Sequence, residues 1–217
     1  MQNKLAEISI AFSNIYSGWI LWNLFLAFIP LVLSFWLFRR KTNVRSVPWW
    51  LGVAVYLAFL PNAPYLLTDI IHLIRGIRAG NSVWVIALIF VPLHVLAILS
   101  GFEAYVVSLL NQGHYLKRQG QKQYVGWSEL LTHALCAIGI YLGRFRRFNS
   151  WDLVSDPGNL LLQTLDDLTS KLPLLVIGVT FIILMVLYWL LKQITLGLLL
   201  RVRYARMHKD IDLDRQD

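Results

Sequence analysis

The sequence predicts an all-α, polytopic membrane helix bundle of about five transmembrane helices, the second of them broken by prolines. Three observations favour this class: 57% of the 217 residues are hydrophobic, only 15% are charged, and the mean hydropathy is +0.58. Such a chain is too apolar for a soluble domain and too short for several domains. We therefore expect residues 1–217 to form a single integral membrane domain.

The predicted spans are apolar runs that approach or exceed the roughly 20 residues needed to cross a bilayer. Before them, residues 1–18 carry apolar side chains at helical spacing, which predicts an amphipathic segment on the membrane surface. After them, residues 201–217 form a basic tail. The cluster at 39–41 follows the first span without a cleavage pattern, as in a signal-anchor. The spans cover residues 19–38, 47–71, 82–110, 127–145 and 172–200.

The positive charges predict how the chain is oriented. With the N-terminus outside, the cytoplasmic segments 39–46, 111–125 and 192–217 contain 13 of the 20 Lys and Arg residues. The positive-inside rule therefore predicts an outer N-terminus and a cytoplasmic C-terminus. Because the net charge of +8 is spread over span ends, with no continuous basic patch, we expect no nucleic-acid partner. Cys136 is the only cysteine, which excludes a disulfide framework and a Cys-based zinc site.

Polar residues within the second span mark the centre of a predicted site. Pro61 and Pro64 each remove a backbone donor and disfavour helix in the residue before them. Such a break is tolerated at membrane depth only where protein buries it or where it lines a wet cavity. We expect Pro64 to begin a second half-helix, Asn62 to help cap it and Gly76 to end it.

The spacing along this half-helix places Tyr65, Thr68, Asp69 and His72 on one face. Asp69 and His72 are candidates for a catalytic acid and base. The alternative is a simple proline kink, with Asp69 and His72 paired and solvated at the water boundary.

A second polar run, residues 141–152, follows the fourth span on the same predicted outer face. Its Arg144 opposes the positive-inside bias, so an acid such as Asp69 or Asp152, or an anionic ligand, should offset it. A guanidinium can bind a phosphate or carboxylate through two parallel hydrogen bonds. We expect an outward-facing pocket with Asp69 and His72 in catalytic roles and ligand contacts from Asn23, Asn62, Tyr65, Arg144, Asn149 and Asp152.

Titratable residues also occur deeper in the spans. Glu129 and His133 share a face of the fourth span with Arg144, a stripe that could pass protons. In the third span His94 and Glu103 are nine residues apart, about half a turn out of phase, and either could be a partner of His133 or Glu129.

A metal site is a further interpretation of the polar residues. Asp69, His72 and Asp152 would supply the oxygen and nitrogen ligands of a divalent ion. Nothing in their spacing requires a metal, and no metalloprotease, Walker or dinucleotide-binding motif occurs. We expect no metal and no cofactor.

After the outer polar run, residues 156–168 fit a short amphipathic surface helix that begins near Asp156 and ends before Pro173. This helix could roof the pocket.

Two motifs and a short pair resemble a known family. They are Phe59-Leu60-Pro61-Asn62-Ala63-Pro64-Tyr65 with Thr68-Asp69, then Tyr141-Leu142-Gly143-Arg144 with Asn149-Ser150-Trp151-Asp152, and Trp22-Asn23. In these the chain is similar to domain of unknown function 1361, a family of bacterial integral membrane proteins. The resemblance covers nearly the whole chain and implies a bacterial inner membrane. It implies no activity and no catalytic residue.

Three classes of function follow from the predicted pocket. The first is binding or processing of a small anionic or lipid-linked molecule at the outer leaflet, with or without catalysis. The second is a transporter or channel component, gated at Pro61 and Pro64. The third is an assembly partner without chemistry, whose polar cluster only holds the spans together. Membrane lipids are partners in all three, and the oligomeric state is left open.

Overall fold

The computed structural model describes residues 19–40, 45–80 and 82–214, so the predicted surface segment at 1–18 lies outside it. Helices account for almost all of the described chain, and no strand occurs within it. The helices are α2 (Trp19–Phe38), α3 (Val47–Phe59), α4 (Asn62–Tyr65), α5 (Ile70–Arg78), α6 (Val83–Val85), α7 (Val91–Arg118), α8 (Val125–Tyr141), α9 (Asp152–Ser155), α10 (Pro157–Thr169) and α11 (Lys171–Asp214).

Short turns of other helical types join some of these helices. Two are 3₁₀ turns, η1 (Leu66–Asp69) and η3 (Lys122–Tyr124). Two are π-helical, η2 (Ile86–Phe90) before α7 and η4 (Leu142–Arg146) after α8.

Five helical segments among the described residues are long and apolar enough to cross a membrane. This confirms the predicted all-α polytopic class and identifies a multi-pass membrane protein. The segments are Ile20–Phe38, Val47–Arg78, Val83–Arg118, Lys122–Arg146 and Lys171–Met207.

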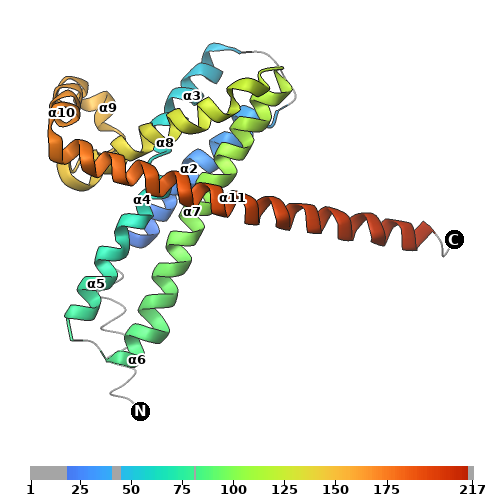
Figure 1. Ribbon diagram of the computed structural model, residues 1–217, viewed down its shortest axis with the longest axis horizontal. Helices are drawn as coiled ribbons and strands as arrows, with labels where there is room; N and C mark the ends of the chain where they lie inside the picture. The colour runs from blue at the N-terminus through green and yellow to red at the C-terminus, as the bar shows by residue number, and fades with distance from the viewer. Residues whose placement is uncertain (1–18, 41–44, 81, 215–217) are drawn as a thin grey trace.

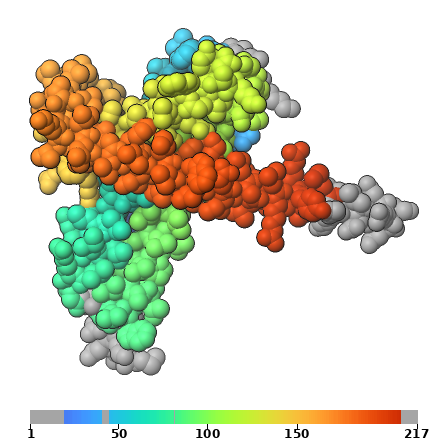
Figure 2. Space-filling model, viewed as in Figure 1, coloured from blue at the N-terminus to red at the C-terminus, as the bar shows by residue number. Residues whose placement is uncertain are grey.

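The helices are packed at different inclinations. α2 lies along α7, while α11 crosses α7 and packs on α8 (Figure 1). The C-terminal part of α11 projects beyond the other helices (Figure 2). The small helices α9 and α10 lie together at the other end of α11.

Residues 60–65, here called the proline segment, interrupt the regular α-helix of the second span. The backbone nevertheless stays helical through this segment. α3 ends at Phe59, and Pro61 precedes the short α4. Pro64 therefore lies inside α4 and not at its first position, and the Asn62 side chain does not cap it. The chain continues through η1 into α5, which contains Gly76 and ends at Arg78. The expected roles of Pro64, Asn62 and Gly76 at the ends of the half-helix are wrong, because the backbone stays helical around the prolines.

Two glycines let neighbouring helices approach this interruption closely. A Cβ atom on Gly101 of α7 would lie 2.9 Å from the carbonyl oxygen of Ala63. A Cβ atom on Gly139 of α8 would lie 2.7 Å from the Pro61 ring. Leu60 and Ala63 are consequently wholly buried. Leu60, Ala63 and Pro64 are thus buried against neighbouring helices, as an interruption at membrane depth requires.

We expect Gly139→Ala to destabilise the protein, because the added methyl group overlaps the Pro61 ring and overpacking typically costs about 1–3 kcal/mol. Gly126 lies in the same helix, and a Cβ there would meet nothing within 4 Å. Gly126→Ala is therefore the control and should leave stability unchanged or slightly raised. Thermal unfolding of the purified variants in detergent measures both, and equal midpoints would contradict the close packing.

Candidate functional site

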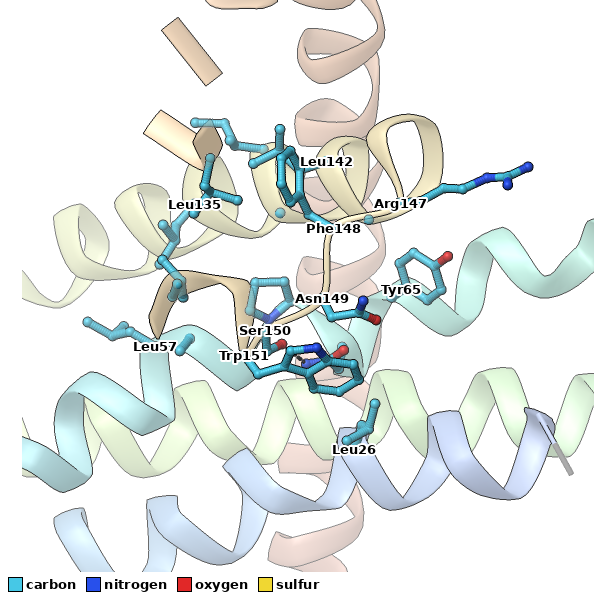
Figure 3. Close-up of a pocket in the computed structure, with 18 of the residues that line it drawn as sticks. Leu26, Leu57, Tyr65, Leu135, Leu142, Arg147, Phe148, Asn149, Ser150 and Trp151 are labelled. Atoms are coloured by element: carbon cyan, nitrogen blue, oxygen red, sulfur yellow. Dashed lines mark hydrogen bonds between the residues drawn. The ribbon is translucent and has the colours of Figure 1, made fainter. Parts of the chain in front are cut away.

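A cavity of about 670 Å³ lies beside the proline segment. Its walls come from α2, α3, α4, α8, the chain from η4 to Leu153, and α10 (Figure 3). The lining residues are Trp22, Asn23, Leu26, Ala54, Leu57, Ala58, Pro61, Asn62, Tyr65, Leu135, Ile138, Gly139, Leu142, Gly143, Arg147, Phe148, Asn149, Ser150, Trp151, Leu153, Leu160 and Thr164.

The cavity has an apolar end and a polar end. Leu57 of α3 and Leu135 of α8 lie at the apolar end, together with Ala54, Ala58 and Ile138 from the same two helices (Figure 3). Tyr65, Asn149 and Arg147 lie toward the other end (Figure 3), and Asn23, Asn62 and Ser150 supply further polar side chains to the lining. An elongated molecule with one polar and one apolar end would match this distribution.

One side chain joins the two polar runs that the sequence analysis singled out. The Asn62 amide nitrogen donates to the Phe59 carbonyl at 2.9 Å and to the Ser150 hydroxyl at 2.8 Å. The first bond partners a carbonyl at the end of α3, and the second connects the proline segment to the loop after η4. Asn62 therefore positions this loop against the cavity.

Gly143 brings η4 close to the proline segment. A Cβ there would lie 3.2 Å from the Tyr65 ring, so a larger residue would push the ring away. The turn that follows has Arg147 in the left-handed region, at φ 61° and ψ 27°. This conformation is unfavourable for a residue other than glycine and ends the helix. It directs Phe148, Asn149 and Ser150 back over the cavity, while the Arg147 side chain extends outward past the polar end (Figure 3).

Asp69 lies behind the cavity wall. It is 2% exposed, and its Oδ2 accepts a hydrogen bond of 2.9 Å from the Asn23 side chain, which does line the cavity. Its Oδ1 is also buried and has no hydrogen-bond partner. Arg144 attracts this carboxylate electrostatically, but no ion pair within 4 Å joins them in the described structure.

His72 and Asp152 also lie off the cavity wall. His72 is half-buried on α5, within electrostatic range of Arg144, Arg75 and His94. Asp152 accepts hydrogen bonds from the Asn149 backbone and the Ser155 hydroxyl at the start of α9. The structure thus places Asn23, Asn62, Tyr65 and Asn149 on the wall, and Asp69, His72, Arg144 and Asp152 outside it.

The ion pair at this end of the molecule involves different residues from those the sequence suggested. Arg146 donates from Nε to Asp167 Oδ2 at 3.0 Å and from a terminal nitrogen to Oδ1 at 2.5 Å. Asp167 lies on α10 and is only 1% exposed. The bidentate pair fixes α10, and α10 supplies Leu160 and Thr164 to the cavity wall. The sequence analysis did not predict this pair. The adjacent acids Asp166 and Asp167 in the expected surface helix are the feature of the sequence that could have indicated a partner for Arg146.

The titratable residues of the fourth span face other helices. Glu129 accepts hydrogen bonds from Tyr188 and Lys192 of α11, and His133 Nδ1 lies 2.6 Å from the Tyr105 hydroxyl of α7. Glu103 accepts from Thr195 of α11. These residues therefore join α7, α8 and α11, and none of them lines the cavity.

The metal hypothesis finds no support in the side-chain arrangement. Among the residues that the structure describes, no three His, Cys, Asp or Glu side chains converge so as to hold a metal ion. Asp152 is also occupied by its hydrogen bonds within the loop.

Comparison with known protein families gives a match over most of the chain. The model of the family described as "Protein of unknown function (DUF1361)" matches residues 22–186. No curated protein and no solved structure matches the chain. The matched segment includes every lining residue of the cavity.

We expect Asp167→Asn to loosen α10, because the amide loses one acceptor oxygen and the charge that holds Arg146. The adjacent Asp166 is 74% exposed and lies 3.9 Å from Arg146, so Asp166→Asn is the matched control. Limited proteolysis should cut residues 156–170 faster in Asp167→Asn than in the wild type and the control. Equal cutting rates in all three proteins would show that the ion pair does not fix α10.

Proposed function

Since the chain belongs to the DUF1361 family of proteins of unknown function, we propose its function from the cavity alone: it binds a lipid or lipid-linked molecule with an anionic or neutral polar head. The head lies at the polar end among Asn62, Asn149 and Ser150. The chain of the ligand lies between α3 and α8.

The division of the cavity into two ends supports this proposal most directly. Its volume of about 670 Å³ is within the range of typical ligand sites. The apolar end is formed by membrane-spanning segments, and both Leu57 and Leu135 are partly exposed on them. A lipid chain could therefore enter from the side without passing through water.

The polar residues of the cavity wall are suited to hydrogen bonds with a ligand more than to ion pairs. Asn, Ser, Thr and Tyr side chains supply donors and acceptors, and Arg147 is the only charged residue among the lining residues of the described structure. This set is compatible with an anion or a neutral polar group and unfavourable for a cation, which would have no carboxylate there.

Binding is better supported than catalysis. Asp69 and His72 stay candidates for an acid and a base, yet neither lines the cavity, and Asp69 is bonded to Asn23, which does. A ligand in the cavity would meet them only after side chains of the wall moved.

The other two classes of function have less support. A transport path through Glu129 and His133 would require a polar continuation of the cavity, whereas neither residue lines it and α8 contributes only Leu135, Ile138 and Gly139. A purely structural role for the polar cluster would require a filled interior, and a cavity is present.

From the distribution of positive charges we infer an N-terminus outside and a C-terminus in the cytoplasm, and this orientation would put the polar end of the cavity at the outer leaflet. The membrane in this proposal is the bacterial inner membrane, which the family resemblance suggests.

Filling the apolar end should remove the ligand. Ala58 lines the cavity, whereas Val55, one turn earlier on α3, is 43% exposed and off the wall. We expect Ala58→Phe to lose most of the co-purified lipid seen by native mass spectrometry, and Val55→Phe to keep it. An unchanged lipid profile in a folded Ala58→Phe protein would overturn the proposal.

Removing a head-group contact should weaken binding more gently. The Asn149 side chain has no hydrogen-bond partner among the described residues, so Asn149→Ala breaks no internal bond. Loss of one hydrogen bond should weaken binding of the co-purified lipid roughly fivefold. Asn159→Ala, on the exposed side of α10, is the control and should bind like the wild type.

Cysteine labelling tests the orientation. Cys136 is fully buried, so the wild-type protein should react little with a membrane-impermeant maleimide. Ser155 is exposed on α9, and Ser155→Cys should react in intact cells from outside. Labelling only after the inner face is made accessible would invert the proposed topology.

A further inference from the structure

We propose a second ligand site at the opposite ends of α2 and α3 from the cavity: Arg39 and Arg45 form a clamp for a phosphate group. The cavity contacts the N-terminal part of α2 and the C-terminal part of α3. The clamp lies where α2 ends, α3 begins and α7 ends.

Each guanidinium group donates through Nε to a side chain of α7, and that of Arg45 also lies 5.9 Å from the centres of the Trp49 and Tyr115 rings. The Nε atom of Arg39 donates to the side-chain oxygen of Asn111 at 2.6 Å. The Nε atom of Arg45 donates to the Tyr115 hydroxyl at 3.0 Å. Each bond uses the inner nitrogen and leaves the two terminal nitrogens without a hydrogen-bond partner among the described residues. These terminal nitrogens are the donors that bind a phosphate or carboxylate bidentately.

The two acceptors are themselves fixed. Asn111 is wholly buried and donates through its amide nitrogen to the Ser34 hydroxyl at 2.9 Å, which leaves its oxygen facing Arg39. Tyr115 is 7% exposed and packs against the rings of Phe38 and Trp49. The guanidinium groups are therefore oriented before any ligand arrives.

The spacing of the acceptors suits one anion. Asn111 and Tyr115 are four residues apart on α7, so they share a face and lie roughly 6 Å apart along its axis. Two guanidinium groups anchored at this spacing can approach the same phosphate from two sides. Arg118 adds a third cation, with its guanidinium 5.7 Å from the centre of the Tyr115 ring.

No acid neutralises these cations within the described part of the chain. Residues 19–40, 45–68 and 104–128 contain no Asp or Glu. The described ion pairs join Arg146 to Asp166 and Asp167, and Lys192 to Glu129, all of them on other segments. Arginines gathered without a counter-charge repel one another, and a bound anion would remove that repulsion.

A general attraction to a negatively charged membrane would need positive charge but no particular side chain. The Nε hydrogen bonds require arginine, because lysine carries all its N–H donors on one freely rotating nitrogen and has no planar fork. Substitution by lysine therefore separates a clamp from a charged surface. Arg40 is the matched control: it adjoins Arg39, but its guanidinium lies over the Trp36 ring at 5.2 Å.

The test titrates the purified full-length protein in a neutral detergent with dioleoylphosphatidylglycerol and counts adducts by native mass spectrometry. We expect the double variant Arg39→Lys, Arg45→Lys to bind about tenfold more weakly than the wild type, which corresponds to one lost charge-assisted hydrogen bond. Arg40→Lys should bind like the wild type. Thermal unfolding of each variant reports whether the fold is retained.

Further ligands identify the chemistry and the source of the anion. Dioleoylglycerol, which has no phosphate, should not bind at this site. Displacement of phosphatidylglycerol by inorganic phosphate would identify a soluble phosphate as the ligand, and lack of displacement would identify a lipid head group. Unchanged binding in the double lysine variant would overturn the clamp. Loss of phosphatidylglycerol in Ala58→Phe alone would also overturn it, since the lipid would then occupy the cavity.

Discussion

The structure depends on one constraint: backbone groups inside a membrane must find partners in the protein, because lipid offers none. Pro61 and Pro64 interrupt the hydrogen bonds of the second span, and the surrounding helices compensate. Gly101 and Gly139 allow α7 and α8 to close around the interruption, and Asn62 donates to the carbonyl of Phe59. The same amide also donates to the Ser150 hydroxyl. A single side chain therefore satisfies a carbonyl at the end of α3 and positions the loop at residues 147–151, which lines the cavity.

Opposite ends of α2 and α3 therefore have different chemistry. At one end they contribute apolar side chains and the Asn23 amide to a cavity that has a single charged side chain, Arg147, on its described wall. At the other end they supply arginines that are fixed by α7. If both proposals hold, the protein contacts lipids of both leaflets: one enters a cavity from the side, and the other binds through its phosphate group. α7 would then be the common support, since it packs along α2 and contacts the proline segment.

The sequence predicted the features that follow from local rules. Span number follows from apolar length, and the break follows from Pro61 and Pro64. Counting membrane crossings predicts that Asn62 and residues 149–152 lie on the same membrane face, and the bond from Asn62 to Ser150 joins these two segments. The partner of Arg146 could not be predicted in this way, because it depends on how α10 folds back onto η4 and on which face of α10 Asp167 occupies. Asp69 and Asn23 are 46 residues apart, and their bond depends on the rotation of two spans about their axes. Spacing along the chain does not specify that rotation.

The length of α11 has a geometric consequence. Its apolar stretch, residues 172–200, would be roughly 44 Å long as an α-helix, whereas the hydrocarbon layer is about 30 Å thick. An upright helix would leave several apolar turns in water, and a steep tilt removes this mismatch. The crossing of α11 over α7 is compatible with such a tilt (Figure 1). Because Tyr188 and Lys192 connect α11 to Glu129, a bilayer of different thickness that changed the tilt of α11 would also strain this polar junction.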